Sequence, residues 1–131
     1  MCEKMRETVK QSDVFAELAY EVIGEHKDLE KLREVSFGVL ISDKPKKSKR
    51  RVIFAECHKV PDLYKAYVPH EFLIVVYEPN VATLSQDQLK ILMHHELLHI
   101  GISDTGEPYI VPHDIEEFRS IIDMYGLDWA M

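Results

Sequence analysis

The sequence predicts a small single-domain α+β fold, and three observations lead to this prediction. The chain has 131 residues, which is the length of one domain. Apolar residues recur at helical spacing near both ends and before residue 100, while alternating or continuous apolar runs lie between them. We therefore expect a sheet of about three strands packed against three helices, with residues 1–131 as one domain and residues 1–11 mobile.

The N-terminal half supplies one helix and two strands. Ser12 and Asp13 can cap a helix that continues to about His26, because apolar residues follow at helical spacing. Residues 28–33 can add a short turn. Residues 35–41 alternate between apolar and small or polar side chains, which predicts a half-buried strand, and residues 52–60 predict a second strand. The connection between them, residues 42–51, is polar and carries six basic side chains.

The C-terminal half supplies the third strand and two helices. Residues 72–77 are apolar at every position, so we expect them to form the most deeply buried strand. Ser85 and Gln88 fit a capping box that begins a helix ending near Ile100, with Gly101 as its C-terminal cap. A short extended segment over residues 109–111 precedes a final helix that follows Pro112.

Composition and charge narrow the classes of function. The chain carries 16 basic and 23 acidic residues, a net charge of −7, which argues against nucleic-acid binding over the whole surface. Two cysteines fit a reducing compartment. The longest strongly apolar stretch has six residues, too few to cross a bilayer, and the first ten residues do not resemble a secretory signal. We expect a cytoplasmic protein with no membrane partner.

The predicted helix that begins at Ser85 contains a metal-binding pattern. His95 and His99 are four residues apart, so their imidazoles share one helical face and can bind the same zinc ion. Glu96 lies about 100° around the helix from His95, where its carboxylate can accept a proton from an attacking water as a general base. These residue types at this spacing predict a zinc-dependent hydrolase that cleaves peptide bonds.

A catalytic zinc site needs a third protein ligand, and the candidates lie downstream. His113 is the only histidine beyond the pair, and it stands near the start of the last predicted helix. Glu117 shares a helical face with His113, so either could bind the metal while the other supports a ligand. Glu116 and Asp104 are further alternatives.

Several segments together resemble a known family. They are residues 94–100, residues 109–118 and residues 125–129, with similar stretches at 54–60 and 72–79. In these segments the chain resembles the metallopeptidase family found in phages and prophages. The resemblance implies a small zincin-like fold, a zinc ion on the helical histidines, His113 as the third ligand, peptidase activity, and the bacterial host cytoplasm as its location.

Two other functions stay open at this stage. The chain could be a zinc-binding interaction module with a zincin-like shape and no turnover. It could also associate with nucleoprotein through the basic loop Lys44–Arg51, because six cations on one loop can hold a phosphate backbone. For the peptidase, we expect an extended peptide substrate to add as a strand to one edge of the sheet that contains residues 35–42 or residues 52–60.

Overall fold

A four-stranded sheet forms the centre of the computed structural model, which describes residues 9–48 and 51–112. Its strand order is β1-β2-β6-β5, and the strands span Val9–Gln11, Phe37–Ser42, Phe72–Tyr77 and Ala55–Lys59 respectively. β2 and β6 are parallel, whereas β1 and β5 run antiparallel to their neighbours. The three predicted strands are present. β1 adds a fourth strand inside the segment that we expected to be mobile.

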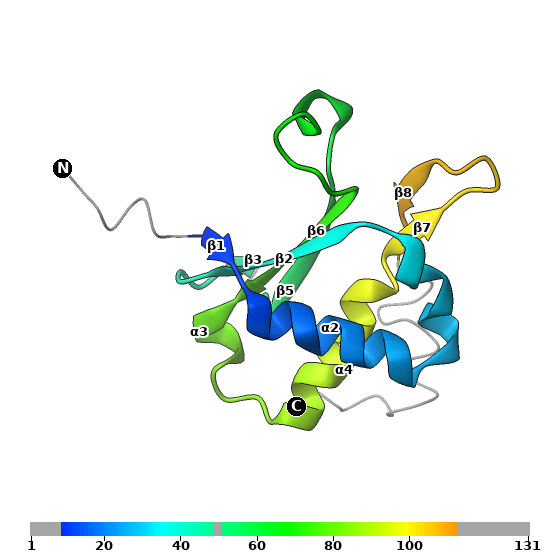
Figure 1. The fold of residues 1–131 in the computed structure, drawn as a ribbon. Coiled ribbons are helices and arrows are strands. Elements are labelled where there is room, and N and C mark those ends of the chain that lie inside the picture. The colour runs from blue at the N-terminus through cyan, green and yellow to red at the C-terminus, as the bar shows by residue number, and fades with distance from the viewer. Residues whose placement is uncertain (1–8, 49–50, 113–131) are drawn as a thin grey trace.

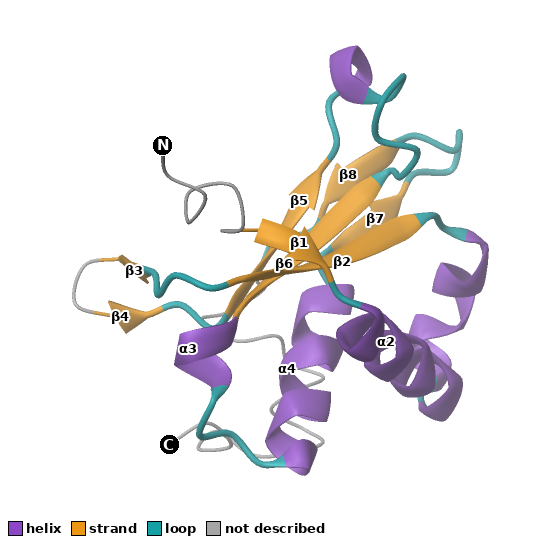
Figure 2. Cartoon of the chain, turned by 60° about the vertical axis from the view of Figure 1, so that its left-hand side comes forward, coloured by secondary structure: helices purple, strands orange, loops and turns teal. Residues whose placement is uncertain are grey.

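The two longest helices lie against one face of this sheet (Figures 1 and 2). The predicted N-terminal helix is α2, Asp13–Glu25, and Ser12 caps it by accepting a hydrogen bond from the amide of Phe15 (3.2 Å). The helix that carries the metal-binding pattern is α4, Gln86–Leu97. Shorter helical segments are the 3-10 helices η1, Lys27–Glu34, and η2, Asp62–Tyr64, and the α-helix α3, Glu78–Val81. The mixed α+β class predicted from the sequence is therefore correct.

β6 shows how the core is divided between the two faces of the sheet. Phe72, Ile74 and Val76 are completely buried beneath the helices, while the alternate side chains on the outer face are half-buried. In the described part of the chain the helices cover one face only, so β6 alternates as a half-covered strand does. The expectation of a strand buried on both faces is correct for the inner face alone.

The start and the end of α4 differ in how well the sequence predicts them. Ser85 and Gln88 form the predicted capping box, with reciprocal hydrogen bonds of 3.1 and 2.9 Å. The helix stops at Leu97, three residues earlier than expected, and residues Ile100–Ile102 form strand β7. Gly101 is not a helix cap. It allows a close approach, since a Cβ there would lie 2.6 Å from Cζ of Tyr109 on strand β8, Pro108–Ile110.

Two small hairpins complete the described chain. β7 and β8 pair antiparallel, and their turn contains Gly106 at a φ of 87°, a conformation that glycine adopts without strain. The basic segment between the predicted strands forms a second hairpin of β3, Lys47–Ser48, and β4, Arg51–Val52. The final predicted helix lies outside the described residues. No helix in the described ranges is long and apolar enough to span a membrane.

Candidate metal centre

The end of α4 brings together the two histidines that the sequence singled out. His95 lies in the last turn of the helix and His99 in the turn that follows it. Their ring centroids are 5.2 Å apart with an interplanar angle of 69°. Two imidazoles on one tetrahedral zinc, each with a Zn–N distance of about 2.0–2.1 Å, hold their centroids roughly 5 Å apart. The spacing of this pair therefore fits a shared metal ion.

His99 is held in place by two reciprocal hydrogen bonds with Val111. Its Nδ1 donates to the carbonyl of Val111 (2.7 Å), and the amide of Val111 donates to the carbonyl of His99 (2.7 Å). Because a carbonyl oxygen can only accept, Nδ1 carries the proton and the lone pair is on Nε2. Metal-binding histidines are commonly oriented by such a bond. Sequence reasoning missed this role of Val111, since spacing gives no signal for a backbone carbonyl.

Glu96 is buried beside a pocket. Only 5% of the surface of Glu96 is exposed, and the pocket has a volume of about 260 Å³. The lining consists of residues 51–55 together with Leu92, His95 and Glu96. The pocket thus lies between α4 and the segment that leads into edge strand β5, and it places a carboxylate and an imidazole at one small opening.

The thiol of Cys57 on β5 lies close enough to Glu96 for the carboxylate charge to affect its pKa. It is half-buried on the inner face of β5, where it packs against the core. Burial, and then the negative charge of Glu96, raise the pKa of the Cys57 thiol to about 12. A thiol with this pKa is neutral and unreactive at physiological pH, so Cys57 has a structural role in the packing of β5.

The third ligand is not settled by the described residues. His113, Glu116 and Glu117 all lie outside them. Asp104 is described and lies exposed in the β7–β8 turn. Among the described residues, no group of potential metal ligands combines Asp104 with the two histidines. The choice of His113 therefore remains a prediction.

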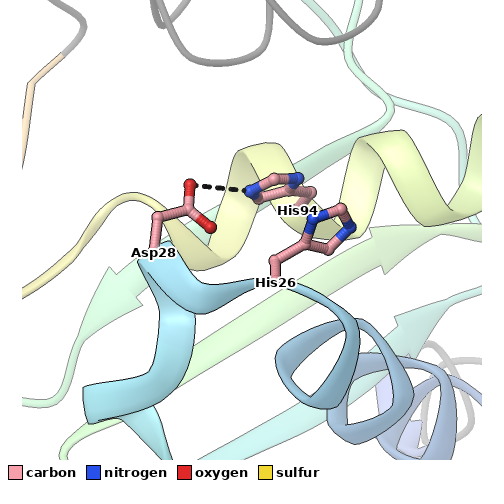
Figure 3. Close-up of side chains that lie close together, drawn as sticks. All are labelled: His26, Asp28 and His94. Atoms are coloured by element: carbon pink, nitrogen blue, oxygen red, sulfur yellow. Dashed lines mark hydrogen bonds and ion pairs between the residues drawn. The ribbon is translucent and has the colours of Figure 1, made fainter.

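A different group of potential ligands lies on another side of α4 (Figure 3). His26, Asp28 and His94 each offer one ligand atom, and these atoms lie within 4.8 Å of one another. The rings of His26 and His94 stack with centroids 4.2 Å apart, and Nε2 of His94 is 3.1 Å from Oδ2 of Asp28. His94 is completely buried, and burial lowers its pKa. Sequence reasoning did not predict that His94 belongs to a group of potential ligands. Its position three residues before the buried Leu97 was the available signal.

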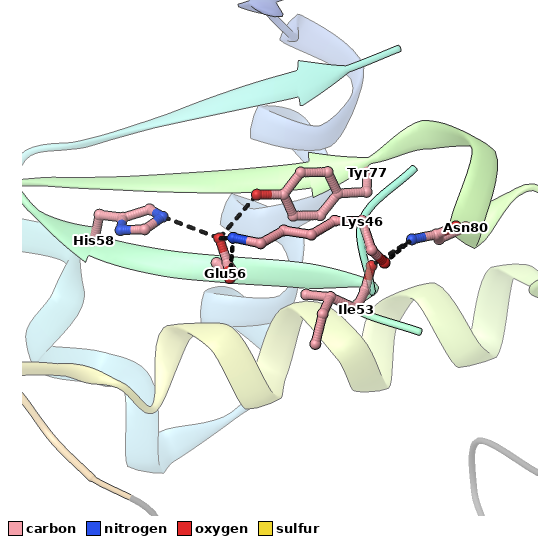
Figure 4. A network of polar contacts seen from close by, with 6 residues as sticks. All are labelled: Lys46, Ile53, Glu56, His58, Tyr77 and Asn80. Atoms are coloured by element: carbon pink, nitrogen blue, oxygen red, sulfur yellow. Dashed lines mark hydrogen bonds and ion pairs between the residues drawn. The ribbon is translucent and has the colours of Figure 1, made fainter. Parts of the chain in front are cut away.

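A polar network covers the outer face of β5 (Figure 4). Glu56 accepts hydrogen bonds from Nζ of Lys46 (2.8 and 2.9 Å) and from the hydroxyl of Tyr77 (2.8 Å), and Nε2 of His58 lies 3.3 Å away. Burial would raise the pKa of Glu56, but the bonds from Lys46 and Tyr77 outweigh it and lower the pKa. Asn80 donates to the carbonyls of Lys46 and Ile53 (2.9 and 2.8 Å), so it joins the two segments that flank the basic hairpin.

An α+β domain with two imidazoles at the spacing of a shared metal ion, one of them lining a pocket with a buried carboxylate, has the features of a metal-dependent hydrolase. The chain belongs to the putative phage metallopeptidase family, whose model matches residues 7–131. This match confirms the family that the sequence segments resembled. Comparisons with curated proteins and with solved structures give no match.

Proposed function

We propose that the chain is a zinc-dependent metallopeptidase in which His95, His99 and His113 bind the metal and Glu96 is the general base. The observation that carries the proposal is the pair of imidazoles, 5.2 Å apart, together with the pocket that His95 and Glu96 line. Imidazole nitrogens are ligands that zinc prefers, and a site of three protein ligands leaves a position for water. A zincin-like fold and a location in the bacterial host cytoplasm belong to the same proposal.

The chain path supports His113 as the third ligand. Val111 is tied to His99 by the two 2.7 Å hydrogen bonds, and His113 is two residues further along. Two residues of extended chain span about 7 Å at most, so this short tether would allow His113 to reach the metal that His99 binds. Glu116 and Glu117 have a longer tether and are less constrained. This argument favours His113 over both carboxylates.

The residues of the chain divide the chemistry between them. A bound zinc ion would polarise the scissile carbonyl and lower the pKa of water to about 7. Glu96, which is buried and lines the pocket, would take the proton from the attacking water and deliver it to the leaving amine. The hydrogen bond from His99 to Val111 would hold the imidazole in its ligand tautomer.

The edge strand β5 is the element that we propose for substrate binding. The two strands considered from the sequence, β2 and β5, lie in one sheet, and β2 pairs with both β1 and β6, so β2 is not an edge of that sheet. Among the described strands β5 pairs with β6 alone. The segment that leads into β5 also lines the pocket of Glu96. An extended peptide added along β5 would therefore place its backbone near the carboxylate.

Metal content and activity of designed variants test the proposal. We expect about one equivalent of zinc at this site in the purified protein, measured by elemental analysis, and its loss in His95→Ala, His99→Ala and His113→Ala. Glu117→Ala is the matched control and should keep the metal. Glu96→Gln should keep zinc and lose hydrolysis of a peptide library. If Glu96→Gln leaves the biological activity intact, the chain is an interaction module and the peptidase proposal fails.

The basic hairpin supports a second candidate function, contact with nucleic acid. Lys44, Lys47 and Arg51 are exposed, and the hairpin projects beyond the sheet (Figure 2). Lys46 is paired with Glu56, and Lys49 and Arg50 lie outside the described residues. Replacing Lys44, Lys47 and Arg51 by glutamine should weaken DNA binding. It should also reduce the slope of the logarithm of the binding constant against the logarithm of salt concentration, by the amount that about three phosphate contacts contribute. A protein that shows no DNA binding at low salt excludes this function.

A further inference from the structure

Three elements that are distant in the sequence converge at the buried side of α4. His26 stands between α2 and η1, Asp28 lies in the first turn of η1, and His94 comes from α4 (Figure 3). The imidazoles of His26 and His94 stack at 4.2 Å, and the carboxylate of Asp28 is 3.1 Å from His94. The fold thus brings two nitrogen donors and one oxygen donor together at one point.

This point is separate from the pocket of Glu96. His94 and His95 are consecutive on a helix, so their side chains diverge by about 100°. His95 lines the pocket with residues 51–55, whereas His94 is completely buried and faces His26 and Asp28. One ion cannot be shared by the two groups of ligands.

We propose that His26, Asp28 and His94 form a second metal site, which takes a zinc-like divalent cation and fastens the α2–η1 junction to α4. Two imidazoles and one carboxylate are a donor set that zinc-like cations prefer. The side chain of Asp28 is 37% exposed, so an ion can enter from that side and complete its coordination with water. The site does not depend on the proposed peptidase function.

The ligand atoms must move closer when the ion binds. They lie within 4.8 Å of one another, whereas a tetrahedral zinc holds its ligand atoms roughly 3.3 Å apart. His94 is fixed in the core, so the movement falls on the half-buried His26 and the exposed Asp28. Binding should therefore tighten the junction between α2 and η1 and raise the melting temperature.

Zinc titration of the full chain in a background without His95 and His99 tests the site. The protein is His95→Ala/His99→Ala, stripped of metal, and the readouts are bound zinc per chain and the melting temperature. We expect one zinc per chain, and we expect His26→Ala or Asp28→Asn in that background to weaken its binding by about a hundredfold or more. Both substitutions lie outside the core, so each variant should fold, which circular dichroism checks. His94→Ala is avoided because it opens the core.

Two matched controls and the opposing results complete the experiment. His58→Ala removes an exposed histidine on the outer face of β5, and Glu30→Gln removes an exposed carboxylate from η1, so both should bind zinc unchanged. The proposal is overturned if the double variant binds no zinc, or if zinc binding survives His26→Ala and Asp28→Asn. Zinc retained by the double variant and lost with His26→Ala supports the second site even if the pocket of Glu96 proves to bind none.

Discussion

The thiol of Cys57 offers a direct measurement of how β5 lies over Glu96. Burial and the charge of Glu96 raise its pKa from 9.0 to about 12. Three pKa units lower the thiolate fraction near pH 8 by about a thousandfold, and the thiolate is the reactive form. In a metal-free Cys2→Ser protein, iodoacetamide should therefore modify folded Cys57 about a thousandfold more slowly than the urea-unfolded chain, as followed by mass spectrometry.

Substitution of Glu96 separates the two causes of this slow reaction. Glu96→Gln removes the negative charge and should speed the alkylation of Cys57, while burial keeps it slower than in the unfolded chain. Glu17→Gln, which removes an exposed carboxylate on α2, should leave the rate unchanged. The reasoning is refuted if folded and unfolded chains react at similar rates, or if Glu96→Gln has no effect on the rate. Because the folded pKa is raised, Cys57 also favours folding below about pH 9, and that contribution should disappear as the pH rises toward 12.

Three further predictions concern stability, measured by urea denaturation. Ile74→Ala should cost about 2–5 kcal/mol, because the side chain is completely buried in the core; a cost below about 1 kcal/mol would contradict the packing. Glu56→Gln should cost about 1 kcal/mol at neutral pH, since it weakens the half-exposed pair with Lys46. The lowered pKa of Glu56 favours folding above its usual pKa of 4.5 and less at lower pH, so the variant should lose less stability on acidification than the native chain. Gly101→Ala should cost about 1–3 kcal/mol by displacing the ring of Tyr109, and Tyr109→Ala in the same chain should recover part of that loss; strictly additive effects would argue against the contact.

Local signals predicted the elements that depend on neighbouring residues. The cap at Ser12, the capping box at Ser85 and the apolar run that forms β6 are all visible within a few positions of the sequence. The pair of His95 and His99 was likewise predicted from spacing alone, although the helix ends before the second histidine.

Long-range contacts explain what the sequence did not predict. Glycine is the residue type that most often caps the C-terminus of a helix. At Gly101 this local preference is overridden by the pairing of β7 with β8, which places the ring of Tyr109 beside it. The cluster around His94 was missed because Asp28 is 66 residues away. β1 was missed because three exposed residues form a strand only when β2 provides hydrogen-bond partners.

The reciprocal bonds between His99 and Val111 have a consequence for engineering the protein. They close the base of the β7–β8 hairpin, so the two ends of this loop hold each other at a fixed separation whatever its tip contains. The tip at residues 104–106 is exposed and its sequence is turn-like. A short tag or fluorescent peptide inserted there should be accommodated as a longer loop, which gives an attachment point within the chain beside the candidate metal centre and leaves His99 in place.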